Sequence, residues 1–257
     1  GNKLFSGASE TYSTTDLDTI LTNSTDTTYD FIYVSDANAD AQSSDNLKVL
    51  SFITNSVAVK PDMYVAGGND ASEWDASGGS TEIAQFYNNE YTTVVHGGIK
   101  LSSQKGEGFK EYNSLYHSAL ALGREAGLAP QVPLDFKNLG VIGLVHQLND
   151  SEVEEGLDAG VLMSRLSDSS FEVVKGVNSE QNNNFLVNQD GSTPVKSIRR
   201  IVRQLNKELT FNLKNSLLKN PAGPNRNTLS TEDVETFVAG YLKNISAMST
   251  LLNVSRD

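Results

Sequence analysis

Short apolar runs rich in aromatic and β-branched residues alternate with segments of helical periodicity along the first part of this 257-residue chain. The strand-like runs are "YDFIYVSD", "DMYVAGG", "YTTVVHGG" and "LGVIGLVHQL". Apolar residues three or four positions apart mark the segments "SDNLKVLSFITNS", "STEIAQFYNNE" and "KEYNSLYHSALALGREAGL" as helices. This alternation predicts an α/β fold with a largely parallel sheet flanked by helices.

Two of the helical segments carry more detailed predictions. Near the N-terminus, "STTDLDTILTN" predicts a helix with Thr14 or Thr15 as its N-cap. In the longest segment Gly127 is expected to end the helix. The residues of that helix expected to face the core are Tyr112, Leu115, Tyr116, Ala119 and Leu122.

The pattern changes after the fourth strand-like run. An acidic helix is expected to start at Asn149 or Asp150, and "VLMSRL" and "FEVVKGV" predict an antiparallel pair around an "SDSS" turn. A polar stretch, 178–193, then predicts a loop or hinge, and two helices follow on either side of Pro221 and Pro224. We therefore expect an α/β core domain over 1–185 and a smaller, largely helical α+β domain over 186–257.

Charge is distributed unevenly along the chain. The formal net charge of -12 divides into -9 for 1–110, -8 for 111–195 and +5 for 196–257. No cysteine is present, which excludes disulfides, thiolate catalysis and cysteine-bound zinc. No apolar run approaches the roughly 18 residues that a membrane helix needs, so membrane insertion is not expected. The asymmetry suggests an electrostatic partner for the C-terminal segment.

The basic helix "SIRRIVRQLNKELT" carries most of that positive charge. Its apolar stripe predicts a docked face, with the basic side chains on the other faces. A plain solvated surface is one interpretation, and nucleic-acid binding is another, which the acidic body and the lack of interleaved aromatic residues disfavour. Contact with the acidic surface of a second copy of the chain is the third.

Residues capable of catalysis or ligand binding lack the motifs that such chemistry requires. His96 and His117 have no nucleophile motif beside them, and they are expected at a strand end and on a helix surface, respectively. The stretch "DANADAQSSDNL" imitates a calcium loop but has Ala41 and Leu47 where glycine and glutamate are needed. The glycine pairs 67–68 and 97–98 match no phosphate-binding fingerprint. No catalytic residue, cofactor or metal ion is therefore expected; the alternative is an α/β hydrolase or small-ligand-binding domain that acts at the strand ends near His96.

Four motifs in the same order resemble the contractile tail sheath protein of bacteriophages. They are "LFSGASETYSTTDLDTIL", "HSALALGREAGLAPQVPLDFKNLGVIGL", "LNDSEVEEGLDAGVLMSRLSDSSFEVVKGVNS", and "SIRRIVRQLNKEL" followed by "GPNRNTLSTEDVETFVAGYLKNI". The likeness runs through nearly the whole chain. It implies a structural, non-enzymatic protein whose core is a subtilisin-like α/β domain without the catalytic triad.

The resemblance also implies partners and a location. Sheath subunits polymerise as hexamer-like stacked rings around a tail tube protein, between baseplate and tail terminator proteins, in a virion tail assembled in the host bacterial cytoplasm. Extended N- and C-terminal arms link neighbouring subunits, and because this chain stops short of both we expect it to be the core of a longer protein. Direct contact with nucleic acid is not expected.

The charge asymmetry and the resemblance together give a contact hypothesis. Basic residues of one copy would face acidic residues of its neighbour. The candidates are Arg199, Arg200, Arg203 and Lys207 on the basic side and Glu152, Glu154 and Glu155 on the acidic side.

Overall fold

The computed structural model describes residues 19, 30–33, 44–56, 61–69, 79–103, 106, 108–167, 170–180, 196–213, 215 and 231–254. The chain divides into two compact units, 1–200 and 201–257. The division falls within one helix, α6 (Lys196–Leu213). The predicted domain boundary at residue 185 lies outside the described residues and stays a prediction.

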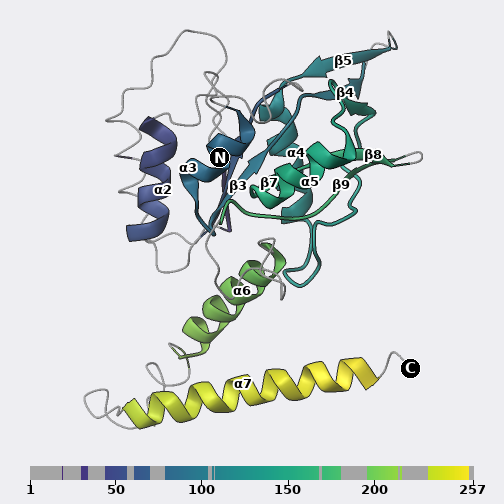
Figure 1. The fold of residues 1–257 in the computed structure, drawn as a ribbon. Helices are drawn as coiled ribbons and strands as arrows, with labels where there is room; N and C mark the ends of the chain where they lie inside the picture. Colours follow the sequence, from purple (N-terminus) through teal and green to yellow (C-terminus); the bar gives the residue numbers. More distant parts are fainter. Residues whose placement is uncertain are drawn as a thin grey trace. The chain divides into compact units, whose positions relative to one another are not determined.

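The first unit is built on a four-stranded parallel sheet (Figure 1). Its strands, in spatial order, are β1 (Phe31–Tyr33), β2 (Asp62–Ala66), β3 (Thr92–Val95) and β7 (Val161–Leu162). Every pairing between neighbours is parallel, with Met63 beside Thr92 and Val94 beside Val161. The predicted mixed α/β fold with a largely parallel sheet is therefore confirmed.

Helices cover this sheet on both faces, and its central strands are therefore buried throughout. They are α2 (Ser44–Ser56), α3 (Ser80–Tyr87) and α4 (Ser114–Ala126). Figure 1 shows α2 and α3 on one side of the sheet and α4 on the other. All residues of β2 and β3 are buried, as expected for strands of a parallel sheet enclosed by helices. The three helices match the predicted segments, although α4 begins later than expected.

Two smaller antiparallel sheets complete the first unit. One contains β5 (Phe109–Tyr112), β4 (Ile99–Ser102) and β6 (Gly143–Leu144) in that order, and the other pairs β8 (Ser164–Ser167) with β9 (Ser170–Val173). The predicted antiparallel pair is confirmed. The prediction of "LGVIGLVHQL" as the fourth parallel strand is wrong, because this run supplies only β6, whereas β7 takes that place in the parallel sheet.

The buried face of α4 differs from the predicted one. The predicted helix began at residue 110, but residues 109–112 form β5, which pairs with β4. Tyr116 is exposed, whereas His117 is fully buried. The buried residues of α4 are Ser114, His117, Ser118, Ala121 and Glu125. The predicted apolar face is wrong at Tyr116 and Ala119, which are exposed, although Leu122 packs half-buried against the core. The residues that α4 buries are mostly polar, and several of them hydrogen-bond within the unit.

Helix α5 (Asp150–Asp158) starts as the sequence predicts. The side chain of Asn149 accepts a hydrogen bond from the Glu152 backbone N–H, and the Glu152 carboxylate accepts one from the Asn149 N–H. This reciprocal capping box satisfies two backbone donors that would otherwise have no partner in the helix.

The described part of the second unit consists of helices, the remainder of α6 and α7 (Thr231–Val254). The Tyr241 hydroxyl donates to the Glu208 carboxylate at 2.7 Å and so joins the two helices. Within the described ranges, no helix is long and apolar enough to cross a membrane. The predicted N-terminal helix and most of the calcium-like loop lie outside the described residues.

Candidate functional site

Two buried polar clusters of the first unit contain most of the residues that the sequence marked as functional. The strand-end cluster lies where β2 and β3 end, around Ser80, His96 and His117. The α6 anchor joins the first turns of α6 to α4 and the sheet through Glu125.

Glycines allow close packing in the strand-end cluster. A Cβ atom on Gly67 would lie 2.5 Å from the Ser80 hydroxyl and 3.0 Å from the Val95 carbonyl, so only glycine fits there. Gly97 has a φ of 93°, which L side chains rarely adopt. Both glycine pairs therefore serve the packing and turning of the backbone, in accord with their lack of a phosphate-binding fingerprint.

Ser80 and His96 form a pair that resembles half of a catalytic triad but is enclosed. The Ser80 hydroxyl lies 2.7 Å from Nδ1 of His96 and accepts a hydrogen bond from the Gly68 N–H at 2.8 Å. Ser80 is 0% exposed and His96 is 3% exposed. A nucleophile must reach its substrate, and neither group reaches the surface. Their geometry suits a clamp between α3 and the ends of β2 and β3.

His117 is a second enclosed histidine and is not on the helix surface as predicted. Its Nδ1 lies 2.9 Å from the Gly97 carbonyl, which can only accept, so Nδ1 carries the proton. Nε2 then accepts from the Ser164 hydroxyl at 3.0 Å. Burial lowers the pKa of His117 to about 4, with hydrogen bonds to backbone carbonyls opposing the shift. The imidazole is thus neutral at pH 7 and joins α4 to β8.

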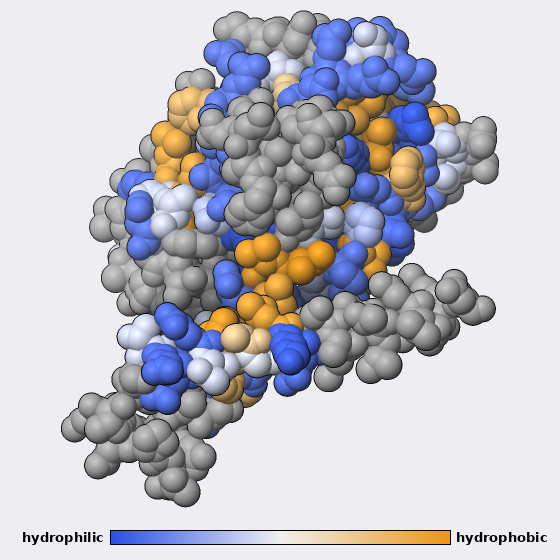
Figure 2. All heavy atoms as spheres, turned by 60° about the horizontal axis from the view of Figure 1, so that its bottom comes forward, coloured by the Kyte–Doolittle hydropathy of each residue, from blue (hydrophilic) through white to orange (hydrophobic). Residues whose placement is uncertain are grey.

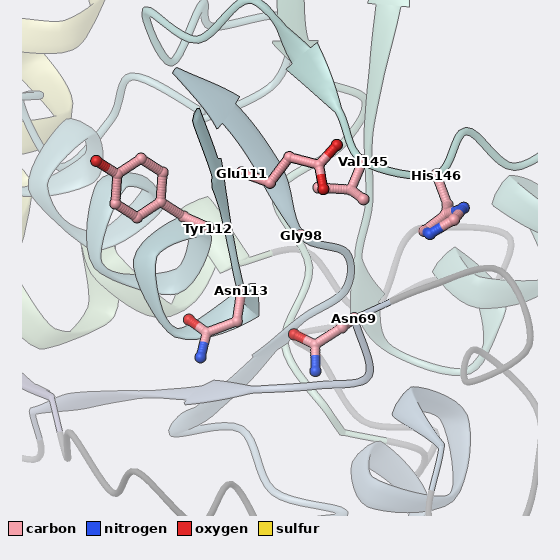
Figure 3. A pocket seen from close by; sticks show the side chains of 7 residues that line it. All are labelled: Asn69, Gly98, Glu111, Tyr112, Asn113, Val145 and His146. Atoms are coloured by element: carbon pink, nitrogen blue, oxygen red, sulfur yellow. The ribbon is translucent and has the colours of Figure 1, made fainter. Parts of the chain in front are cut away.

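A shallow pocket of about 250 Å³ lies beside the strand-end cluster (Figure 3). Its lining residues are Asn69, Gly98, Glu111, Tyr112, Asn113, Val145 and His146. The pocket is close to the place where the alternative hypothesis put a ligand, but His96 does not line it. Glu111 is engaged at 3.6 Å with Lys100, and among the described residues no group of acidic and histidine side chains could hold a metal ion.

The α6 anchor is a buried network of charges around Glu125, which is 1% exposed. The Glu125 carboxylate accepts from the Lys196 ammonium at 2.8 Å and from the Tyr64 hydroxyl at 2.5 Å. Lys196 also donates to Thr93 at 2.7 Å and lies 3.8 Å from the centre of the Tyr64 ring. Burial, followed by the nearby Glu125 charge, raises the pKa of Tyr64 well above its usual range, so the phenol stays protonated and donates.

Arg200 extends this network to the end of α4. Its Nε lies 3.6 Å from the Glu125 carboxylate, and its terminal nitrogens donate to the carbonyls of Glu125, Leu128 and Val132. Two of these carbonyls belong to the last turn of α4 or to the residues just after it, where a helix lacks donors and carries partial negative charge. Arg200 therefore caps α4 while it anchors α6.

Arg199 makes a separate contact on the neighbouring loop. Its Nε is 3.7 Å from the Glu90 carboxylate, and its guanidinium carbon lies 4.4 Å from the centre of the Tyr91 ring. Burial and the Glu90 carboxylate raise the pKa of Tyr91 to about 12, which keeps this ring neutral beneath the cation.

These positions correct the contact hypothesis. The prediction of a basic face free for a partner is wrong at Arg199 and Arg200, because both are buried and paired within their own unit. Arg203 is buried as well, and Lys207 is half-buried. On the acidic side, Glu152 serves in the capping box, whereas Glu154 and Glu155 are exposed. Arg199 and Arg200 pair with Glu90 and Glu125 instead of with these α5 glutamates.

The sequence could not reveal the anchor because its partners are distant along the chain. Glu125 lies 75 residues before Arg200. Its position in a helix whose neighbours are Arg124 and Ala126 gave no sign of burial. The one available signal was that three cations share the first turns of a helix, which is compatible with either a surface or a buried anchor.

Comparison with known proteins gives matches to solved structures alone. No family model and no curated protein sequence matches the chain. A sheath tail protein from Desulfitobacterium hafniense matches with a TM-score of 0.65 at 12% identity, covering 97% of this chain and 52% of that one. A sheath tail protein from Listeria innocua matches with a TM-score of 0.66 at 16% identity, covering 91% and 50%.

The matches extend over nearly the whole chain, and the chain spans about half the length of the proteins that it matches. At such low identity, a similarity of this kind reflects the fold. The order of the sequence motifs independently resembles the same family. The chain thus has the fold of tail sheath proteins, the family that its sequence motifs resemble.

Proposed function

We propose that this chain is a structural subunit of a contractile tail sheath. The observation that carries the proposal is the fold shared with two sheath tail proteins over more than nine-tenths of the chain. The four sequence motifs in matching order support it. The enclosed Ser80–His96 pair supports a non-enzymatic role, because no catalytic group in that cluster reaches the surface.

The mechanism follows from how a sheath acts. Copies of the chain stack in hexamer-like rings around a tail tube protein, between baseplate and terminator proteins, within a virion tail assembled in the host cytoplasm. On contraction the subunits move as rigid bodies and make more contacts, and the energy released drives the tube through the host envelope. Strand-exchanging arms keep the neighbours connected during this motion. In this proposal the first unit is a subtilisin-like domain without the catalytic triad.

The compact packing of the first unit is compatible with movement as a rigid body. Strands β2, β3 and β7 of its parallel sheet are buried throughout, and one continuous hydrophobic core joins the sheet to α2, α3, α4 and α5. The α6 anchor adds three charged side chains that are each less than 4% exposed. Removing Glu125 would leave two buried cations without their anion, so the network resists partial opening.

Charge contacts between copies remain part of the proposal in a reduced form. Glu154 and Glu155 are exposed on α5 and offer an acidic surface to a neighbouring subunit. On the basic side Lys207, which is half-buried, is the candidate left, because Arg203 is buried like Arg199 and Arg200. Each exposed pair contributes little alone, and repetition over many subunits makes such contacts matter.

Electron microscopy tests the proposal. The chain is expressed alone and, in parallel, with the N- and C-terminal arms that the family resemblance implies. Regular hollow tubes from the longer form are expected, because the arms connect the subunits. Dispersed particles from both forms at high concentration and low salt would count against a sheath role.

A charge reversal tests the contacts separately. Lys207→Glu in the longer form should hinder tube formation, because it reverses the cation of the proposed contact. Lys48→Glu, on α2, is the matched control, because it reverses a charge outside the proposed contact. Normal tubes from the Lys207→Glu variant would remove this residue from the proposed contact.

A further inference from the structure

The three-stranded antiparallel sheet of the first unit has one packed face and one open face. Side chains alternate between the two faces along each strand, and cross-strand partners share a face. Ile99 is fully buried, and its β5 partner Tyr112 packs against the core. Lys100 and its partner Glu111 therefore belong to the open face, together with Phe109, which is 54% exposed. Figure 2 shows one surface of the molecule, in which hydrophobic side chains such as these lie among hydrophilic ones.

The pocket of about 250 Å³ lies at one end of this open face, over Gly98. Gly98 directly precedes β4, and its carbonyl accepts a hydrogen bond from the Val145 N–H at 2.8 Å. A Cβ atom on Gly98 would lie 2.9 Å from a backbone oxygen, so glycine gives the pocket a floor without a side chain. In Figure 3, Gly98 lies between the Glu111 carboxylate on one side and the amides of Asn69 and Asn113 on the other.

Asn113 occupies a position in which an asparagine side chain normally caps a helix. It is the N-cap residue of α4, yet its side chain makes no capping hydrogen bond. The Ser114 N–H donates instead to the side-chain oxygen of Asn69 at 2.8 Å. Asn69 thus satisfies a donor at the start of the helix, and the amide of Asn113 lines the pocket without a role in the cap.

The lining of the pocket is polar but close to electrically neutral. Glu111 contributes a carboxylate, and Lys100, at 3.6 Å, offsets its charge. Among the described residues that line the pocket, none is a lysine or an arginine, so a phosphate would meet a carboxylate and no cation. The described part of the chain also offers no group of side chains that could hold a metal ion. The lining therefore favours a neutral ligand.

We propose that this pocket binds one ring of an uncharged saccharide. Amides both donate and accept hydrogen bonds and a carboxylate accepts several, so Asn113 and Glu111 suit neighbouring hydroxyl groups. Val145 and the bare backbone of Gly98 offer an apolar surface to the C–H face of the ring. The volume lies below the roughly 300–1,000 Å³ of sites for drug-sized ligands, as a single sugar ring requires. This inference goes beyond the sheath role and does not depend on it.

Phe109 extends the site along the open face. It lies two positions before Glu111 on β5, and the Lys100 ammonium is 5.0 Å from the centre of its ring. An exposed aromatic ring offers a flat apolar surface on which a second sugar ring can pack. A disaccharide should therefore bind more tightly than a monosaccharide.

Ligand-detected NMR with the whole chain tests this inference. The probes are the methyl pyranosides of glucose, galactose, mannose and N-acetylglucosamine, and the β1,4-linked dimer of the sugar that binds best. We expect a dissociation constant of about 1 mM for at least one monosaccharide, because an open pocket makes few contacts. Absence of binding by every probe, at concentrations about tenfold higher, would overturn the inference.

Two variants of the lining locate the sugar. Glu111→Ala should weaken binding at least about tenfold and Asn113→Ala about threefold, because hydrogen bonds to charged groups are the stronger ones. Asn113→Ala should hardly change the midpoint of thermal unfolding, because this side chain does not cap α4. Glu154→Ala, on the exposed face of α5, is the control and should retain the affinity of the wild type. Binding that neither lining variant alters would place the sugar elsewhere and overturn the assignment.

Charged probes test the ligand class. Neither inorganic phosphate nor tetramethylammonium should displace the sugar. Displacement by either ion, lost in Glu111→Ala, would overturn the assignment to a neutral ligand. Phe109→Ala should abolish the tighter binding of the dimer, and a preference that persists in this variant would overturn the extension of the site along β5.

Discussion

The first turns of α6 and the exposed face of α5 carry opposite charges, which suggests the two sides of one contact. The two regions differ in burial, however. The cations of α6, Lys196 and Arg200, are buried against Glu125. On α5, Glu154 and Glu155 remain in solvent. A cluster of charges in a sequence therefore says little about burial, which depends on whether a distant partner exists to satisfy it. Variants of the two clusters test how far this difference extends.

The largest effect is expected from Glu125→Ala. It leaves Lys196 and Arg200 buried without their anion and Tyr64 without its acceptor, at a cost of about 3–5 kcal/mol in the free energy of unfolding. Urea denaturation measures it. Glu154→Ala on α5 is the control, with an expected change within about 0.5 kcal/mol. Equal losses from the two variants would abolish the distinction between the buried and exposed clusters.

A pH titration distinguishes the buried charged network from the buried neutral His117. The pKa of His117 in the folded state is about 4, below its ordinary value of 6.5, so the unfolded state binds a proton more readily. Its contribution is fully present above pH 6.5 and is lost as the pH falls toward 4, by about 3 kcal/mol in total.

Denaturation of the wild type and of His117→Gln between pH 4 and 7.5 measures this contribution. Only the wild type should show the slope due to His117. An NMR titration that places the imidazole pKa near 6.5 would contradict the prediction.

Arg200→Lys separates charge from geometry within the α6 anchor. Lysine keeps the positive charge but cannot reach three carbonyls with a planar fork, so a loss of about 2 kcal/mol is expected. Hydrogen exchange should rise at the end of α4, where those carbonyls lie. Unchanged stability would show that the ion pair alone holds the anchor.

Asn149→Ala tests the N-terminus of the acidic helix. Loss of the capping box should cost about 1 kcal/mol, because the Glu152 N–H loses its acceptor. Thermal unfolding with Asn149→Asp as the comparison measures it, since aspartate also caps a helix. A larger loss than that of Arg200→Lys would reverse the expected order of the two regions.

The smallest effect on folding is expected from reversing the exposed charges of α5. Glu154→Lys with Glu155→Lys should change the free energy of unfolding by no more than about 0.5 kcal/mol, because solvent screens both groups. The same variant should change the salt dependence of association. A large loss of stability would show that α5 is not the exposed region of this comparison.

Periodicity predicted most of the first unit correctly. Helices α2 and α3, the parallel pairing of β1, β2 and β3, and the cap of α5 followed from local patterns. Strands β4 and β5 were missed because "IKLS" and "FKEY" carry neither a long apolar run nor strict alternation. Their identity depends on pairing with each other, which a single segment does not encode.

The candidate site was predictable in location but not in environment. The sequence placed His96 at a strand end correctly, but its closeness to Ser80 depends on where α3 packs. The inward face of α4 was misjudged because Ser114, His117 and Glu125 are polar, and only partners from β2, β8 and α6 make their burial favourable.

The sequence by itself determined the alternation of strands and helices, the resemblance to tail sheath proteins, the cap of α5 and the end of α4 at Gly127, since these depend on neighbours a few residues apart. Only the tertiary structure decided that the cations of α6 are buried and the acids of α5 exposed. The physical reason is that a charge is buried only where distant groups compensate for its lost hydration, and Glu125 meets Lys196 and Arg200 only once the chain has folded.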